Sequence, residues 1–268
     1  MESTVWMRVA ACMVCLLLPR LAQTADVKEH PPWLEPMKKL NAQFKGDPMY
    51  VARFGDSITV SRAFWSPMGW SDPDPFLSDD GLPRRPLGDK PWKQVIKGIN
   101  DEDGCGSGWS ADNVLKVIDK VLAQRKPQVA IVMIGTNDIS GDATRAPRDY
   151  EQKLEKIIAK CLEAKCIAIL NTIPPRKGFD KAVTEVNEAL KKLAKKHAVP
   201  LVDYHEAIVS RQPAGAWLGT LISDDGVHPT AGKTNDYSPE NLKVSGYALR
   251  TWINFLMLRE VYFKVISK

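Results

Sequence analysis

Cysteine is scarce in this 268-residue chain, and its five cysteines are unevenly distributed. Cys12 and Cys15 lie in an apolar N-terminal segment, and the other three, Cys105, Cys161 and Cys166, cannot all pair with one another because their number is odd. We expect Cys161 on the apolar face of a helix and Cys166 at the start of a strand, both as buried thiols. The chain also lacks the cysteine and histidine spacing of a zinc site.

A long hydrophobic run is missing as well. The apolar run 9–18 near the N-terminus would rise only about 15 Å as a helix, half of the roughly 30 Å hydrocarbon core of a bilayer. It follows the opening MESTVWMR and precedes small residues up to Ala25, an order typical of a secretory signal peptide. We predict a signal peptide over 1–25, a secreted or periplasmic protein and no stable membrane insertion. The alternative is an uncleaved membrane anchor.

Neither sign of charge dominates the chain. The formal net charge is +5, and removing residues 1–25 with Arg8, Arg20 and Glu2 lowers it by one to +4. This balance is too mild to favour nucleic acid as a partner. With 44% hydrophobic residues and no internal repeat, residues 26–268 are expected to form one domain with a substantial core.

Several catalytic and binding motifs are absent. The chain contains neither the Gly-x-Ser-x-Gly elbow of α/β-hydrolases nor the His-Glu-x-x-His helix of metalloproteases. The glycine-rich segment 104–108 departs from the dinucleotide fingerprint because its third glycine comes one residue early. Dinucleotide binding is therefore disfavoured.

Apolar segments of strand length alternate with segments of helical periodicity such as 181–197. This alternation predicts an α/β fold with a parallel sheet, and a weaker candidate strand would make that sheet five-stranded. We expect the last helix to run from about Ser238 to about Val261. The strand candidates are 49–54, 128–134, 166–171 and 199–204, with 95–99 as the weaker one.

Residues 62–92 form an anomalous insertion with six prolines, three tryptophans and little periodicity. Such a long irregular segment is uncommon in a compact domain unless it is functional or disordered, and its tryptophans disfavour disorder. We expect Trp65, Trp70 and Trp92 to shape a substrate site, where indole would stack on a sugar ring or line an acyl pocket. The alternative is local packing that holds the insertion closed.

Three short motifs carry candidate chemistry. Ser57 follows the first strand in Gly-Asp-Ser-Ile, which places a serine nucleophile at the carboxyl edge of the sheet, where ligands bind. Asn137, in Gly-Thr-Asn-Asp after strand 128–134, could donate its side-chain amide to an oxyanion. Asp225 precedes His228 by three residues, a spacing that lets the carboxylate orient the imidazole as a base for Ser57. Singly, each motif could be an ordinary turn or cap.

The order Gly-Asp-Ser, Gly-Thr-Asn-Asp, Asp-Gly-Val-His resembles the SGNH or GDSL hydrolase family over nearly all of the chain after residue 25. The resemblance implies a three-layer αβα sandwich of flavodoxin-like type, with Ser57 as nucleophile, His228 as base and Asp225 as its orienting acid. It also implies an oxyanion hole made by the Ser57 amide, the Asn137 side chain and the amide of a second-block glycine.

The second block departs from the family pattern. Its usual asparagine, two residues before the glycine, is missing because Asp101, Glu102 and Asp103 follow Asn100. The choice between Gly104 and Gly106 as the oxyanion glycine therefore stays open.

The implied reaction is hydrolysis of an ester through an acyl-enzyme, without metal or cofactor. Export and the insertion suggest a small-molecule or polysaccharide ester, such as acetyl groups on a carbohydrate. Two alternatives remain. One is a catalytically silent carbohydrate-binding protein of the same fold, and the other is an O-acyltransferase that passes the acyl group to a sugar.

Overall fold

Four apolar segments form a parallel sheet. The computed structural model describes residues 30–267, and within them β1 to β4 lie side by side in chain order, all parallel. Every residue of β2 and β3 is buried, as expected for a sheet covered on both faces. The four stronger strand predictions are confirmed, the last of them shortened to two residues. The strands are β1 (Asp47–Gly55), β2 (Pro127–Met133), β3 (Ile167–Asn171) and β4 (Leu201–Val202).

The fifth predicted strand is reduced to one parallel bridge between Tyr50 and Lys97. It stays short because the helical turn α3 (Trp92–Val95) precedes it and a turn closed by Gly98 and Asp101 follows it. The bridge nevertheless lies on the far side of β1 from β2. The chain therefore goes first to one side of β1 and then to the other, and the carboxyl ends of β1 and β2 form the switch point at which open α/β sheets bind ligands.

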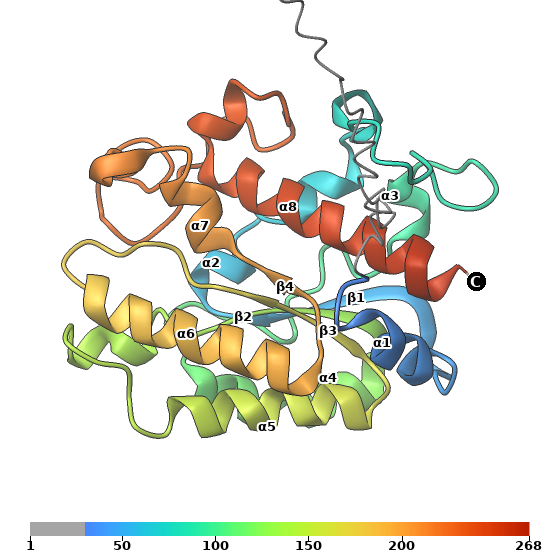
Figure 1. The fold of residues 1–268 in the computed structure, drawn as a ribbon, viewed down its shortest axis with the longest axis horizontal. Helices are drawn as coiled ribbons and strands as arrows, with labels where there is room; N and C mark the ends of the chain where they lie inside the picture. Colours follow the sequence, from blue (N-terminus) through green and yellow to red (C-terminus); the bar gives the residue numbers. More distant parts are fainter. Residues whose placement is uncertain (1–29, 268) are drawn as a thin grey trace, which may run out of the picture. The chain divides into compact units, whose positions relative to one another are not determined.

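Helices cover both faces of the sheet, which confirms the predicted α/β class (Figure 1). One face carries α4 (Ala111–Arg125), α5 (Tyr150–Glu163) and α6 (Asp180–His197), which agrees with the predicted helical segment 181–197. The other face carries α8 (Gly246–Val261), drawn in red in Figure 1 and flanked by the shorter helices. The shorter helices are α1 (Leu34–Asn41), α2 (Ser57–Val60) and α7 (Tyr204–Val209).

The predicted start of the last helix is wrong by several residues. Ser245, not Ser238, caps α8, and its side chain accepts a hydrogen bond from the Ala248 amide. Ser238 instead accepts from the Asn241 amide at the beginning of a single 3₁₀ turn. A serine that caps a short turn has the same sequence signature as one that caps a long helix, so the sequence could not separate the two.

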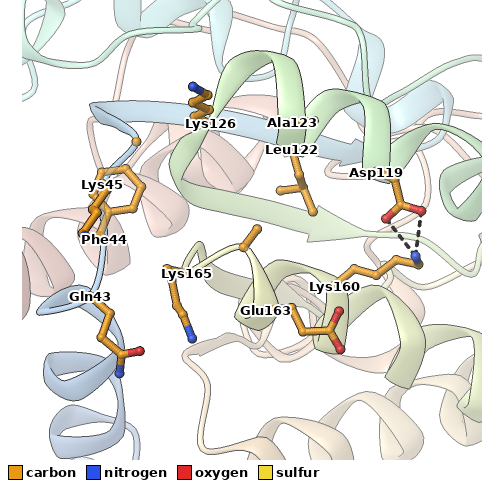
Figure 2. A pocket seen from close by; sticks show the side chains of 12 residues that line it. Gln43, Phe44, Lys45, Asp119, Leu122, Ala123, Lys126, Lys160, Glu163 and Lys165 are labelled. Carbon is orange, nitrogen blue, oxygen red and sulfur yellow. Dashed lines mark hydrogen bonds and ion pairs between the residues drawn. The ribbon is translucent and has the colours of Figure 1, made fainter.

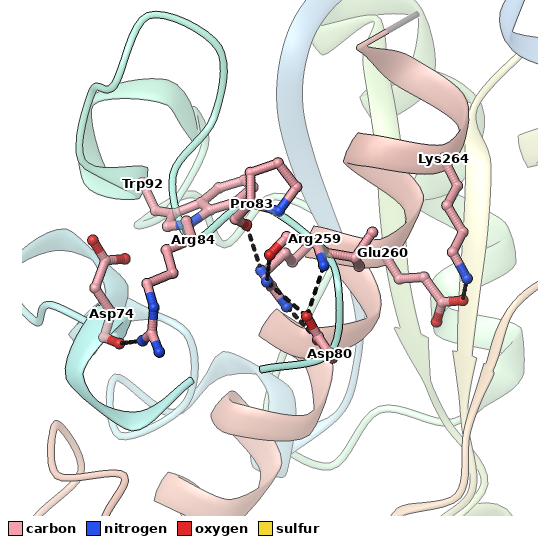
Figure 3. Close-up of polar contacts among 9 residues, drawn as sticks. Asp74, Asp80, Pro83, Arg84, Trp92, Arg259, Glu260 and Lys264 are labelled. Carbon is pink, nitrogen blue, oxygen red and sulfur yellow. Dashed lines mark hydrogen bonds and ion pairs between the residues drawn. The ribbon is translucent and has the colours of Figure 1, made fainter. Parts of the chain in front are cut away.

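Polar side chains tie the mostly buried helix α8 to the rest of the protein. Asn254 and Asn171 exchange two amide hydrogen bonds of 2.7 and 2.9 Å, which join α8 to β3. The buried guanidinium of Arg259 binds both carboxylate oxygens of Asp80, at 2.6 and 3.0 Å, and the carbonyls of Leu82 and Pro83 (Figure 3). The insertion is thus held against α8 by a bidentate ion pair.

The tryptophans of the insertion divide into two groups. Trp65 and Trp92 are fully buried, and Trp92 packs edge-on against Phe255 and Tyr262 near the C-terminus. Trp70 is 57% exposed. Local packing therefore accounts for Trp65 and Trp92, whereas Trp70 presents its ring to solvent.

Residues 31–267 lie in one compact unit. The thiols of Cys105, Cys161 and Cys166 are free and buried, as predicted for the last two. Among residues 30–267, no helix has both the length and the apolar character needed to cross a bilayer. The predicted signal peptide lies outside the described residues.

Candidate active site

A sharp turn delivers Ser57 to the carboxyl edge of the sheet. At Gly55, the last residue of β1, a Cβ atom would lie 2.2 Å from Thr59 Oγ1 and 2.4 Å from the Met133 carbonyl, so only glycine fits. Asp56 then caps α2 by accepting a 3.0 Å hydrogen bond from the Ile58 amide. Ser57 is the first residue of that helix, where its own N–H has no partner within the helix.

His228 is held by a closed loop between residues 223 and 228. The Ser223 amide donates to the His228 carbonyl at 2.8 Å, and the Lys177 amide donates to the Gly226 carbonyl at 2.9 Å. Gly226 has a φ of 73°, and a Cβ there would lie 2.6 Å from Lys177 Cβ. Glycine is therefore required both for the turn and for the close approach of the two segments.

The structure brings the three predicted residues into one hydrogen-bonded chain. His228 Nε2 lies 2.9 Å from Ser57 Oγ, and His228 Nδ1 lies 2.7 Å from Asp225 Oδ2. With its proton on Nδ1, the imidazole can accept the serine proton at Nε2. Two other histidines lie on other helices: the His197 ring, at the end of α6, pairs with Glu155 at 2.9 Å, and His205 lies on α7, where its backbone amide donates to Thr172 Oγ1.

The Asp225 carboxylate is strongly stabilised as an anion. Partial burial alone would raise its pKa, but hydrogen bonds from Ser223 Oγ, the Val227 amide and the His228 amide and ring outweigh that effect and hold the pKa well below its ordinary value. Asp225 therefore keeps its negative charge at any pH at which a histidine titrates, which favours the proton on His228 Nδ1.

Asn137 and Asp138 anchor the glycine-rich loop beside Ser57. Asn137 Nδ2 donates to the Trp109 carbonyl at 3.0 Å, which uses one of its two amide hydrogens. The Asp138 carboxylate accepts from the Ala111 amide at 3.1 Å and so holds the first turn of α4. Among residues 30–267, Asn137 Nδ2 makes no second hydrogen bond.

The glycines of the loop lie at different levels along β1. The loop runs parallel to the end of the strand, with Cys105 opposite Gly55. Gly104 lies deeper, where a Cβ would meet the Arg53 carbonyl at 2.3 Å, and the Gly106 amide donates to the Gly55 carbonyl at 3.3 Å. Gly108 lies beyond the edge, exposed, with a φ of 76°, and within the described residues its amide has no hydrogen-bond partner.

Residues 54–232 match the family described as GDSL-like Lipase/Acylhydrolase. The chain belongs to this family. The sequence-based prediction of an ester-bond hydrolase is thereby confirmed, and the matched range contains all three motifs. No curated protein matches the chain.

Solved structures of similar fold agree with this family. A protein assigned to the lipolytic G-D-S-L family from Desulfitobacterium hafniense is 18% identical, with a TM-score of 0.56, and the match covers 78% of this chain and 99% of that one. The esterase EstA from Pseudoalteromonas sp. is 15% identical, with a TM-score of 0.52 and coverages of 79% and 97%. The lipase/acylhydrolase from Enterococcus faecalis is 20% identical, with a TM-score of 0.53 and coverages of 82% and 98%.

In this GDSL-family hydrolase, a buried arginine outside the matched range contacts the nucleophile turn. Arg250 on α8 donates to the Ile58 carbonyl at 2.8 Å and to Thr59 Oγ1 at 3.0 Å, and its guanidinium lies 3.7 Å from the ring centroid of Phe64. Ile58 is thus held at its amide by Asp56 and at its carbonyl by Arg250. The sequence signal for this contact is an arginine inside a mostly apolar helix.

Burial shifts the pKa values of Asp56 and Arg250, the two charged residues that hold Ile58. Desolvation raises the pKa of Asp56 to about 6, although the Ile58 amide and the positive charge of Arg250 oppose the shift. Desolvation also lowers the pKa of Arg250 to about 10. Arg250 therefore stays protonated at neutral pH, and its charge favours the ionised form of Asp56 directly beside Ser57.

A separate cavity of about 520 Å³ lies at the opposite edge of the sheet (Figure 2). Gly46 and Lys126, which line it, come directly before β1 and β2, and Lys165 comes two residues before β3, whereas Ser57 follows the end of β1. Lys160 in this cavity is paired with Asp119 at 2.7 Å, and Lys126 and Lys165 point to opposite sides. The cavity therefore has no part in the Ser57 site, and its ammonium groups do not converge on one point.

Proposed function

We propose that this hydrolase is a secreted carboxylesterase in which Ser57, His228 and Asp225 act as a catalytic triad. The observation that carries the proposal is the continuous chain of hydrogen bonds, 2.9 Å from Ser57 Oγ to His228 Nε2 and 2.7 Å from His228 Nδ1 to Asp225 Oδ2. These lengths are within the range needed for direct proton transfer between side chains.

The reaction proceeds in two acyl transfers. Ser57 Oγ attacks the ester carbonyl while its proton passes to His228 Nε2, and the imidazolium then protonates the departing alcohol. A water molecule, deprotonated by His228, attacks the acyl-enzyme and releases the acid and free Ser57. Asp225 keeps the imidazole in the required tautomer and stabilises its positive charge between the two transfers.

We further propose that the oxyanion is bound by the Ser57 amide, the second amide hydrogen of Asn137 and the Gly108 amide. Gly108 replaces Gly104 and Gly106 in this role because it lies beyond the edge of β1 and its amide is free, whereas Gly106 already donates to Gly55. The bond from Asn137 to Trp109 links two of the three donors, since Trp109 follows Gly108 directly. Because the positions of these donors are already fixed, they need no reorganisation when the negative charge develops on the oxyanion.

The experiment that tests the proposed function combines a covalent probe with a panel of esters. A fluorophosphonate should label Ser57, as the phosphonate inhibition of EstA from Pseudoalteromonas sp. suggests for the fold. Purified protein should release acid from acetyl esters, with carbohydrate acetates as the proposed natural class. Transfer of the acetyl group to a sugar in place of water would identify an O-acyltransferase instead, and labelling of a different serine would contradict the assignment.

Asn137→Ala should lower kcat by about 10² to 10³, because it removes one oxyanion donor. Steady-state kinetics on a soluble acetyl ester would measure the change. A thermal-unfolding scan is needed beside it because the variant also loses the bond to the Trp109 carbonyl. An unchanged kcat in a folded variant would restrict Asn137 to an anchor of the loop.

Arg250→Lys should lower kcat by about tenfold to a hundredfold with little change in KM, because one ammonium cannot hold both the Ile58 carbonyl and Thr59 Oγ1 and the nucleophile turn then moves. The rate of fluorophosphonate labelling at Ser57 should fall in parallel. Arg148→Lys, at an exposed arginine, is the matched control for the substitution itself. Equal labelling rates in wild type and Arg250→Lys would limit Arg250 to packing.

Export is part of the proposal and predicts a new N-terminus near residues 23–26, since small residues precede the polar stretch there. Mass spectrometry of protein secreted by an expressing cell would measure it. An exported chain that still begins at Met1 would contradict the predicted signal peptide.

A further inference from the structure

A second cavity, of about 580 Å³, lies between the insertion and α8, apart from the three site motifs. Its volume falls within the range typical of small-molecule sites. None of the residues that line it is acidic. The lining includes Pro75, Phe76, Arg211, Tyr237, Lys243 and Trp252.

The wall of this cavity is a fixed aromatic cluster. Tyr237 stacks on Trp252 with ring centroids 5.2 Å apart, and Phe76 meets both rings nearly at right angles, at 86° and 79°. Tyr237 and Trp252 are buried, whereas Phe76 is half-buried and Pro75 exposed. The insertion therefore offers a ligand an apolar surface whose position is set by the rings behind it.

Two cations without acidic partners stand beside that wall. Within the described residues, neither Arg211 nor Lys243 forms an ion pair, and the guanidinium of Arg211 binds only the Ala207 carbonyl, at 2.9 Å. Partial burial lowers the pKa of Arg211, so its charge is incompletely solvated. Gln212 Nε2 donates to the Lys243 carbonyl at 2.8 Å, which fixes the two loops that carry the cations against each other.

Helix α8 lies between the cavity and the turn that carries Ser57. Arg250, which contacts the nucleophile turn, and Trp252, which lines the cavity, are two positions apart on α8 and therefore point to nearly opposite sides of it. A helix with side chains is about 10 Å across. The loops are nevertheless joined, because Thr230, two residues after His228, donates through Oγ1 to the carbonyl of Val244, which follows Lys243, at 2.9 Å. Only a ligand longer than the width of the helix could contact both places at once.

We propose that this cavity binds a uronate residue of an acidic polysaccharide whose ester group is cleaved at Ser57. The inference rests on the proposed function and narrows its substrate to acidic glycans. The uronate carboxylate would bind Arg211 and Lys243 through charge-assisted hydrogen bonds, and the C–H face of the sugar ring would pack on Phe76. A neutral sugar would satisfy only the apolar half of the site.

The test measures binding directly on the full chain carrying Ser57→Ala, so that no substrate is consumed. Calorimetric titration with an unesterified oligogalacturonate should give saturable binding, and a neutral xylo-oligosaccharide of equal length should bind more weakly. Adding Arg211→Gln and Lys243→Gln should raise the Kd for oligogalacturonate by about tenfold, the sum of two partly exposed ion pairs. The matched control is Lys45→Gln with Lys165→Gln, which removes the same charge at the opposite edge and should leave the Kd unchanged.

Three results would overturn the inference. They are equal binding of the neutral and acidic oligosaccharides, an unchanged Kd in the Arg211 and Lys243 variant, and an equal loss of affinity in the control. Failure of the proposed function would be seen separately, as absence of labelling at Ser57 and of acetyl-ester hydrolysis in the wild type. An acetylated oligogalacturonide tested as substrate should show a KM raised about tenfold by the Arg211 and Lys243 substitutions.

Discussion

Ser57→Ala and His228→Ala should each lower kcat by about 10⁶, by analogy with the subtilisin triad, and the double variant should be scarcely worse than either single one. The 2.9 Å contact between Ser57 Oγ and His228 Nε2 makes the two side chains one proton-transfer unit. Once either is gone, the other has no transfer left to perform. Effects that multiplied to about 10¹² would mean that the residues act independently.

The residual rate is the informative quantity in this experiment. It must be measured on protein free of contaminating esterases, for example by active-site titration with a fluorophosphonate before the assay. His205→Ala is the matched control, because His205 follows β4 and its backbone amide is held by Thr172 Oγ1. Near wild-type turnover in His228→Ala together with a large loss in His205→Ala would reverse the assignment of the base.

The parts of the site that the sequence predicted are those that depend on local geometry. Ser57 and Asn137 each follow a strongly apolar strand, and parallel strands bring their carboxyl ends to one edge. The spacing of Asp225 and His228 determines their contact within one short loop. Neither of these inferences needs knowledge of how distant segments pack, which explains why both agree with the structure.

The parts that the sequence did not predict depend on packing between distant segments. We propose Gly108 as the oxyanion glycine because the loop runs along β1 with Cys105 opposite Gly55, and this pairing cannot be predicted from the local sequence. The contact of Arg250 with the Ile58 carbonyl depends on where α8 packs against the nucleophile turn. The sequence does not predict this packing, so it identifies no partner for Arg250. The burial of Trp65 likewise depends on α8, where the Thr251 hydroxyl accepts a hydrogen bond from the Trp65 amide.

The roles of residues in the insertion 62–92 also depend on packing between distant segments. Its tryptophans suggested a substrate site, yet two of the three are core residues and only Trp70 is exposed. The surface that we assign to a ligand instead uses Phe76, which the sequence did not single out, together with Arg211 and Lys243 from distant loops. Composition indicated that the segment was unusual, but only the packing against α8 separates its core residues from its surface.

Asp225→Asn should lower kcat by about 10⁴, less than the loss of Ser57 or His228, because the imidazole is still present but its tautomer is no longer fixed. An asparagine amide can donate to Nδ1, which places the imidazole proton on Nε2. In that tautomer Nε2 cannot accept the serine proton. Asp224→Asn is the matched control, since Asp224 is exposed and His228 Nδ1 is bonded to Asp225. Its turnover should stay close to wild type.

The pH dependence separates this role of Asp225 from a role as a titrating acid. Because hydrogen bonds lower the pKa of Asp225 in the folded protein below its ordinary value, the stabilisation that they give is complete above that ordinary value and is lost only as pH falls through the lowered one. Asp225 therefore stays ionised between about pH 5 and pH 8. Any acid limb of kcat/KM in that window must come from another group, such as Asp56, whose pKa burial raises to about 6. We expect Asp56→Asn to remove an acid limb of the pH profile near pH 6, and Asp225→Asn to keep that limb at a lower overall rate. Loss of the limb in Asp225→Asn alone would contradict the permanently ionised state inferred for Asp225.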